Sequence, residues 1–264
     1  MLHILIHTLR EYGFDAYFIP QNSPPLTNPK WNTPHFSEGC TGGVAEVSEE
    51  WVVLYPEGVF GNPLNAKRVA RYLLNREAAV GGPGMGAAPE DFLITYQKLF
   101  HPTAPVLYYP LFEGEVLIRA GKLDAQRKRT QDAFYVGKGS VYGPCPPISG
   151  ALEITRNWPE SKAALYDMLE NVRVFYSYDW LTSTNCDAAL LGCEVRLIGN
   201  SGPYDAEQLL RKDVELETWD GVDVDGCPFI RAASSGRILN QIQTLKSQFH
   251  PRVVEIFGQI AAMV

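Results

Sequence analysis

An alternation of strand-like and helix-like segments in the second half of the chain constrains the fold most strongly. The segments DAFYVGKG (132–139), VRVFYS (172–177) and EVRLIG (194–199) have the apolar, aromatic and β-branched content of buried strands. Between them, PESKAALYDMLE (159–170) and TSTNCDAALLG (182–192) have the pattern of helices. Strands and helices that alternate at these lengths predict an α/β fold with a parallel sheet covered on both faces.

The first half predicts a second block of the same kind. Apolar residues fall at helical spacing from Leu2 to Leu9, and Gly13 follows as a helix C-cap. We expect strands at DAYFIP (15–20), WVVLYPE (51–57), DFLITY (91–96) and APVLYYPLF (104–112), and helices at NAKRVARYLLN (65–75) and PRVVEIFGQIAAMV (251–264). The charged segment 122–130 predicts a linker. We therefore expect two Rossmann-like, doubly wound domains, 1–128 and 129–264, that face each other across a cleft.

Composition and charge narrow the classes of function. The chain has 264 residues, of which 45% are hydrophobic and 20% charged, as in ordinary folded proteins. Its formal net charge of -7 argues against a general affinity for nucleic acid. The five cysteines are odd in number and lack C-x-x-C spacing, which predicts reduced thiols. Without a signal-peptide pattern or an apolar membrane-spanning window, we expect a cytoplasmic protein, with a membrane surface or another protein as a possible partner.

Polar residues crowd the turn between VRVFYS and the helix that follows it. Asp179 and Asp187 are eight positions apart, so both carboxylates can face one ligand. The hydroxyls of Thr182, Ser183 and Thr184 surround the helix start, where unpaired backbone N–H groups favour phosphate. Ligands of open parallel sheets bind at such turns, beyond the carboxyl ends of the strands. A structural alternative is a T-x-x-D capping box between Thr184 and Asp187.

The turn VGKGS ends another predicted strand. Gly137 and Gly139 flank Lys138, so the backbone can approach a ligand and the ammonium can neutralise a diphosphate. The alternative is an exposed lysine in a glycine-rich turn. The place of this turn, at the end of the first strand of the second block, favours the binding interpretation.

A third candidate is YPEGVFGNPLNA in the first half. Glu57 ends a predicted strand, and Asn62 and Asn65 bracket the start of the predicted helix, so the three can line one cleft. Glu57 at this position is either a general base or the solvated end of the strand. Asn62 alternatively serves only as a helix cap.

Two other patterns predict no site. GGPGMGAAPED (81–91) resembles a dinucleotide-binding loop, but Pro83 and Pro89 interrupt it and no predicted strand leads into it. His3 and His7 share a helical face without a third metal ligand. We therefore expect no metal and no cofactor.

Taken together, these segments resemble the two-domain GT-B glycosyltransferases, in particular bacterial enzymes that build surface polysaccharides. Many retaining members carry an E-x7-E pattern across the turn and helix that hold the sugar nucleotide. Asp179 and Asp187 resemble a D-x7-D version of it, and the following AALLGCEVRLIG is similar to the helix, glycine turn and strand of that family. The segment LYPEGVFGNPLNAKRVARYLLN is similar to the YPE-x-x-x-GNP segment of some polysaccharide transferases.

The resemblance implies a metal-independent glycosyltransferase that transfers a sugar from a nucleotide-sugar donor to a saccharide acceptor, in polysaccharide or glycan biosynthesis. It implies that Asp187 holds the ribose hydroxyls, that Asp179 meets the sugar or the diphosphate, and that Lys138 stabilises the leaving diphosphate. The implied donor site comprises Gly137, Lys138, Gly139, Tyr178, Asp179, Thr182, Ser183 and Asp187. The implied catalytic residues are Glu57, Lys138 and Asp179, and the implied acceptor side is Glu57, Asn62 and Asn65.

Departures from the family pattern leave alternatives. The first strand and Gly-rich loop of the family precede its first helix, and this chain begins at that helix, so we expect a compact fold that lacks this strand. Aspartate also replaces glutamate at both acidic positions and shortens each side chain by one methylene. One alternative is a nucleotide-sugar sensor or partner subunit without activity. Another is a different nucleotide-using α/β enzyme, such as a sugar-nucleotide epimerase.

Overall fold

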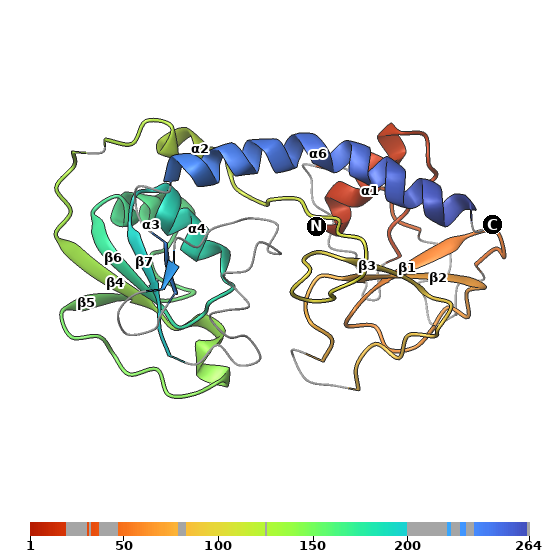
Figure 1. The fold of residues 1–264 in the computed structure, drawn as a ribbon, viewed down its shortest axis with the longest axis horizontal. Coiled ribbons are helices and arrows are strands. Elements are labelled where there is room, and N and C mark those ends of the chain that lie inside the picture. The colour runs from red at the N-terminus through yellow and green to blue at the C-terminus, as the bar shows by residue number, and fades with distance from the viewer. Residues whose placement is uncertain are drawn as a thin grey trace. The chain divides into compact units, whose positions relative to one another are not determined.

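The computed structural model describes residues 1–19, 31, 33–36, 47–78, 83–124, 126–199, 221–222, 228–230 and 235–262. The chain divides into two compact units: unit 1 is Met1–Tyr109 with Leu245–Val264, and unit 2 is Pro110–Thr244. Each unit has its own sheet (Figure 1). These bounds differ from the expected domains, because unit 2 begins earlier in the chain and the last residues belong to unit 1.

The described part of unit 1 contains a three-stranded parallel sheet in the order β1-β2-β3. Its elements are α1 (Leu2–Glu11), β1 (Val52–Pro56), β2 (Arg68–Leu73), β3 (Phe92–Thr95) and the second half of α6 (Ser235–Ala262). The predicted first helix is confirmed. Gly13 follows it with a φ of +83°, the left-handed conformation of a glycine C-cap.

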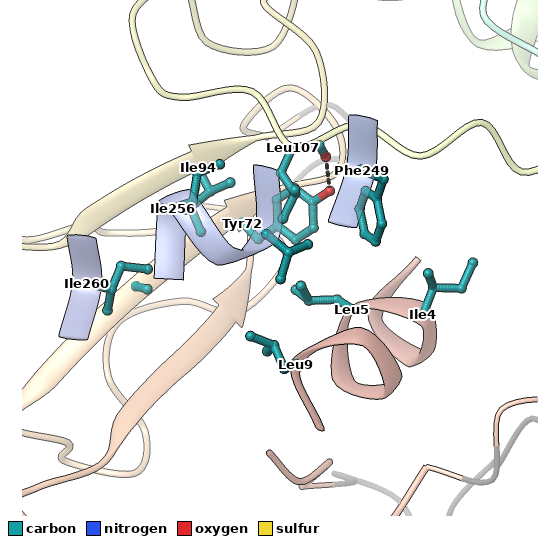
Figure 2. Close-up of a cluster of buried hydrophobic side chains, with 11 residues drawn as sticks. Ile4, Leu5, Leu9, Tyr72, Ile94, Leu107, Phe249, Ile256 and Ile260 are labelled. Atoms are coloured by element: carbon teal, nitrogen blue, oxygen red, sulfur yellow. Dashed lines mark hydrogen bonds between the residues drawn. The ribbon is translucent and has the colours of Figure 1, made fainter. Parts of the chain in front are cut away.

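The core of unit 1 lies where α1 and α6 pack against the sheet (Figure 2). It combines apolar side chains of α1, β2, β3, α6 and the segment after β3 that contains Leu107: Ile4, Leu5, Leu9, Ala70, Tyr72, Ile94, Leu107, Phe249, Val253, Ile256 and Ile260. The hydroxyl of Tyr72 donates to the backbone oxygen of Leu107, so the one polar atom of that side chain is paired inside the core. Burial of each large side chain contributes roughly 1.5–3 kcal/mol, which holds the separate segments together.

The helix predicted over 65–75 is wrong, because this segment contains strand β2. Ala70 and Tyr72 are fully buried and belong to the core cluster, while Arg71 between them pairs with Asp91. The strand is central and pairs with a neighbour on each side, so both of its edges are satisfied. This tertiary pairing outweighs the helical propensity of the alanine and arginine residues in the segment.

Two predicted strands of the first half reduce to single bridges. In the segment 15–20, Phe18 bridges to His35, and Pro20 lies outside the described residues. In the segment 104–112, Val106 bridges to Thr95. The predictions at WVVLYPE and DFLITY are confirmed as β1 and β3.

The described part of unit 2 contains a six-stranded sheet in the order β5-β4-β6-β7-β9-β8. Its elements are α2 (Gly114–Ala120), β4 (Gln131–Tyr135), the 3-10 turn η1 (Gly137–Val141), β5 (Ala151–Ile154), α3 (Lys162–Leu169), β6 (Val172–Ser177), α4 (Ser183–Leu190), β7 (Glu194–Leu197), β8 (Gly221–Val222), β9 (Pro228–Ile230) and the first half of α6. The strands β5, β4, β6 and β7 are parallel, whereas β9 and β8 add antiparallel pairs at one edge. The α/β class with parallel strands is therefore confirmed, and α2, β5, β8 and β9 are elements that the sequence did not predict.

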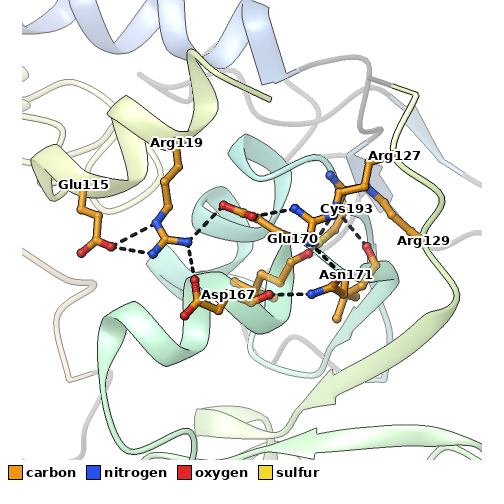
Figure 3. Close-up of polar contacts among 10 residues, drawn as sticks. Glu115, Arg119, Arg127, Arg129, Asp167, Glu170, Asn171 and Cys193 are labelled. Atoms are coloured by element: carbon orange, nitrogen blue, oxygen red, sulfur yellow. Dashed lines mark hydrogen bonds and ion pairs between the residues drawn. The ribbon is translucent and has the colours of Figure 1, made fainter. Parts of the chain in front are cut away.

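Arginines of α2 and of the segment after it bind the end of α3 (Figure 3). Arg119 lies 3.1 Å from one carboxylate oxygen of Glu170, and Arg127 lies 2.8 Å from the other. Arg129 donates to the backbone oxygen of Leu169 at 3.1 Å. The charged segment predicted as a linker is thus attached to unit 2 and forms part of it.

The described helices and cysteines bear on two expectations drawn from the sequence. No helix among the described residues is long and apolar enough to cross a membrane. The described cysteines, Cys145, Cys186 and Cys193, are free thiols, and Cys40 and Cys227 lie outside the described residues.

Candidate functional site

The candidate site lies at the carboxyl ends of β4 and β6, which are adjacent and parallel. The turn after β4 carries the Gly137–Gly139 segment, and the turn after β6 carries Tyr178 and Asp179. A backbone hydrogen bond of 2.9 Å from the Tyr178 N–H to the Tyr135 oxygen joins the turn after β6 to the last residue of β4. The structure therefore brings together two segments that were separate candidate sites in the sequence.

Both glycines of the first turn are required by close packing. Gly137 has a φ of +49°, and a Cβ there would lie 2.4 Å from the Tyr135 ring and 2.6 Å from Asp179 Oδ2. A Cβ on Gly139 would lie 2.5 Å from the Cβ of Tyr178. The small residues thus let the turn after β4 approach the turn after β6, in addition to any approach to a ligand.

Asp179 binds the glycine turn directly. Its Oδ2 accepts a hydrogen bond of 3.0 Å from the backbone N–H of Lys138. Lys138 is exposed, while the aspartate holds its backbone in place. A fixed backbone with an exposed ammonium can bind an anionic group.

Polar side chains also hydrogen-bond to the backbone of the turn after β6. Asn185 of α4 donates from Nδ2 to the backbone oxygens of Asp179 and Trp180, both at 3.0 Å. Ser177 Oγ donates to the same oxygen of Asp179 at 2.9 Å. Asn185 was not predicted from the sequence, because an amide that donates to carbonyl oxygens of the preceding turn does not form the capping-box pattern. These bonds fix the backbone that carries the Asp179 carboxylate.

Helix α4 starts beside this turn. Its N-cap is Thr182, whose Oγ1 accepts from the Thr184 N–H at 3.4 Å, and Ser183 is the first helical residue. The cap is therefore Thr182, two residues before the Thr184 of the alternative T-x-x-D capping box. The hydroxyls of Thr182 and Ser183 lie at the helix end whose dipole favours an anion.

Asp187 lies deeper in unit 2 than the other candidates. It is only 3% exposed, and its Oδ2 lies 3.3 Å from Lys162 Nζ of α3. Burial raises the pKa of the Asp187 carboxyl, and the nearby Lys162 ammonium acts in the opposite direction. Asp179 and Asp187 thus have different partners, a backbone N–H and a lysine, and the ribose contact implied for Asp187 stays a prediction.

Tyr178 is buried and contacts other residues of unit 2. Its hydroxyl donates to the Pro146 oxygen at 2.7 Å, and its ring lies where a Cβ on Gly199 would come within 2.7 Å. Burial raises the pKa of the Tyr178 hydroxyl. Its contact with a donor stays a prediction.

The acceptor-side candidates lie in unit 1, in and after the turn that follows β1. Glu57 Oε2 accepts from the Leu74 N–H at 2.9 Å. Asn62 Oδ1 accepts from the Tyr55 hydroxyl and from the Ala66 N–H, each at 2.9 Å. Because no helix begins here, Asn62 shapes the loop between two strands instead of capping a helix.

Asn65 belongs to the same loop and is exposed. Its φ of +49° is a left-handed conformation, which asparagine tolerates better than most residues. A conformational reason therefore accounts for an asparagine at this position. Its contact with an acceptor sugar stays a prediction.

Comparisons of the chain with protein-family models, curated proteins and solved structures found no match. Within the described ranges, no group of three or more His, Cys, Asp and Glu side chains is placed to hold a metal ion.

Proposed function

We propose that unit 2 binds a nucleotide-sugar and that the protein is a glycosyltransferase of the GT-B type, acting on a saccharide acceptor. The main observation behind this proposal is the hydrogen bond between the Asp179 carboxylate and the Lys138 backbone N–H. It joins a glycine turn to a helix-capping turn, and the two turns follow adjacent parallel strands at their carboxyl ends. Such edges are where α/β sheets bind nucleotides. The two-domain GT-B arrangement is part of this proposal.

The proposed chemistry relies on positioning and charge. The exposed ammonium of Lys138 would neutralise the leaving diphosphate, together with the start of α4 at Thr182 and Ser183. Asp179 would meet the donor sugar or its diphosphate through the edge of its carboxylate that Lys138 leaves uncovered. Glu57 remains the candidate general base or acceptor contact.

A second candidate is a nucleotide-sugar-binding partner subunit without turnover. Its support comes from unit 1, where Glu57 and Asn62 both bind neighbouring segments of the same unit. These bonds give the two side chains a structural role that needs no acceptor. The donor site in unit 2 is the same for both candidates.

The test is a thermal-shift panel of UDP, GDP, dTDP, ADP and CMP, with and without magnesium, on the native chain and Lys138→Ala. A ligand at a hundredfold excess over its Kd stabilises the native state by about 2.7 kcal/mol, which is readily detected. A magnesium-independent shift for one nucleotide, lost in Lys138→Ala, supports the donor site. The absence of a shift for all five contradicts it.

Turnover then separates the two candidates. The nucleotide that binds is supplied as its sugar conjugates, with a panel of saccharide acceptors, and release of free nucleoside diphosphate is measured. Acceptor-dependent release by the purified chain supports the transferase and excludes the inactive partner subunit. Epimerised donor without transfer would instead indicate an epimerase.

A further inference from the structure

Lys162 forms an asymmetric ion pair with Asp187. The side chain of Asp187 is 5% exposed, whereas that of Lys162 is 47% exposed. The Nζ of Lys162 lies 3.3 Å from Asp187 Oδ2 and 5.8 Å from the centre of the Tyr166 ring. A buried anion and an aromatic ring thus hold a cation whose other side faces solvent.

An ammonium group has three N–H donors. Among the described residues, the hydrogen-bond partner of Lys162 Nζ is Asp187. The remaining donors of this exposed group can bind a second anion without breaking the first bond. Because Asp187 and Tyr166 restrict the lysine, such a second bond requires little further ordering of the side chain.

The topology places Lys162 at the edge of the sheet that carries the candidate site. Lys162 is the first residue of α3, which follows β5, and Lys138 lies in the turn after β4. The strand β4 lies between β5 and β6, and all three are parallel. Lys138 and Lys162 are both exposed, and the topology places the turn after β4 and the start of α3 at the same carboxyl edge of the sheet.

We propose that Lys162 is a second contact for the diphosphate of the donor, and that Asp187 acts by positioning Lys162. This inference rests on the proposed function and assigns the anion-binding part of the same site. A diphosphate carries more than one negative charge, whereas a helix N-terminus supplies only about half a positive charge. Lys138 and Lys162 together supply the balancing charge.

The test uses inorganic pyrophosphate as the probe, titrated calorimetrically into the full chain at low salt. The variants are Lys162→Met, Asp187→Asn, the double variant Lys162→Met/Asp187→Asn, and Lys128→Met. Lys128 is an exposed lysine of the same unit and serves as the matched control. We expect loss of a charge-assisted contact to weaken binding roughly tenfold or more in Lys162→Met, with Lys128→Met unchanged.

The double variant separates a ligand contact from a structural ion pair. Removal of Lys162 alone leaves a buried, unpaired carboxylate that destabilises the fold, and Asp187→Asn in the same chain relieves it. We expect the double variant to regain thermal stability but not pyrophosphate affinity. If it regains both, the pair is only structural and the inference is overturned.

The remaining outcomes distinguish this inference from the proposed function. Native affinity for pyrophosphate and UDP in a stable Lys162→Met chain, with loss in Lys138→Met, overturns the inference and leaves the proposed function standing. A native chain that binds neither pyrophosphate nor any nucleoside diphosphate overturns both. A weaker loss in Asp187→Asn than in Lys162→Met supports the positioning role of the aspartate.

Discussion

The carboxylate of Asp179 and the backbone N–H of Lys138 are joined by a 3.0 Å hydrogen bond across the ends of β6 and β4. The carboxylate therefore occupies a backbone donor that a free glycine turn would offer to a phosphate. In this arrangement the Lys138 group that is left without a bond to Asp179 is its ammonium. The hydrogen bond makes Asp179 a residue that shapes the turn as well as a candidate ligand contact.

Substitution of Asp179 tests whether its hydrogen bond or its charge protects the backbone amide of Lys138. Asp179→Ala removes the acceptor of the Lys138 N–H, so we expect faster hydrogen exchange at that amide and a loss of about 1 kcal/mol in the free energy of unfolding. Asp179→Asn keeps an acceptor oxygen and should protect the amide nearly as well as the native residue. Equally fast exchange in both variants would show that the carboxylate charge protects the turn, whereas native-like exchange in both would contradict protection by Asp179.

Gly139→Ala tests the close approach of the two turns. A Cβ at this position would lie 2.5 Å from the Cβ of Tyr178 and 2.6 Å from its backbone oxygen, so something must shift. We expect a loss of about 1–3 kcal/mol, measured by urea unfolding followed by circular dichroism. Gly114→Ala is the matched control in unit 2, because a Cβ there meets nothing within 4 Å. Equal stability of the two variants would contradict the packing described at Tyr178.

Asn185 provides a test of how the turn after β6 is held. Asn185→Ala loses two hydrogen bonds to backbone oxygens, and we expect a loss of about 1–3 kcal/mol. Asn185→Asp should be worse than alanine, because its carboxylate oxygens face the carbonyl oxygens of Asp179 and Trp180. Chemical unfolding of the three chains gives the order native, alanine, aspartate. An aspartate variant that is more stable than the alanine variant would show that these carbonyls are not bound by the side chain.

The sequence predicted unit 2 better than unit 1, and the reason is local patterning. In unit 2, the helices α3 and α4 and the strands β6 and β7 each match their own periodicity and turn signals. In unit 1, β2 contains alanines and arginines that favour a helix, and it becomes a strand because β1 and β3 pair with both of its edges. Pairing between distant segments is not encoded in local periodicity.

The residues of the candidate site also divide into those that local sequence patterns predicted and those that depend on tertiary contacts. Strand-end turns identified Gly137, Lys138 and Asp179, and the structure brings these residues together. The partner of Asp187 could not be predicted, because Lys162 lies on another helix and meets it only through the packing of α3 against α4. Residues that act through tertiary contacts carry no spacing signal in one sequence.

Arg71 and Asp91 form a buried pair whose loss should be strongly destabilising. Their side chains are 2% and 4% exposed, and Arg71 Nε lies 2.7 Å from Asp91 Oδ2. Arg71→Met leaves the carboxylate buried and unpaired, and we expect a loss of about 3–5 kcal/mol in the free energy of unfolding. Arg71→Met/Asp91→Asn should recover most of it, since asparagine still accepts from the Ala88 N–H. No recovery in the double variant would show that the arginine contributes through its hydrogen bond to the Val59 oxygen and its packing on Tyr55, and not through its pairing with Asp91.

The free energy of unfolding should depend on pH partly through the titration of Asp187. Burial raises its folded-state pKa above the value of 3.8 for an exposed carboxyl, against the opposing effect of Lys162, and Glu113 adds a smaller rise. A raised pKa means that the protonated form favours folding. The contribution is therefore fully present below about pH 3.8 and is lost as the pH rises through the folded-state pKa.

Asp187→Asn removes this titration, so the difference in unfolding free energy between native and variant isolates it. We expect native stability to fall relative to the variant from pH 4 upward, by at most about 1.4 kcal/mol per pH unit, and then to level off. Urea unfolding in a pH series from 3.5 to 7 measures this difference. A native chain that gains stability relative to Asp187→Asn as the pH rises would show that Lys162 outweighs burial and that the aspartate is stabilised in its charged form.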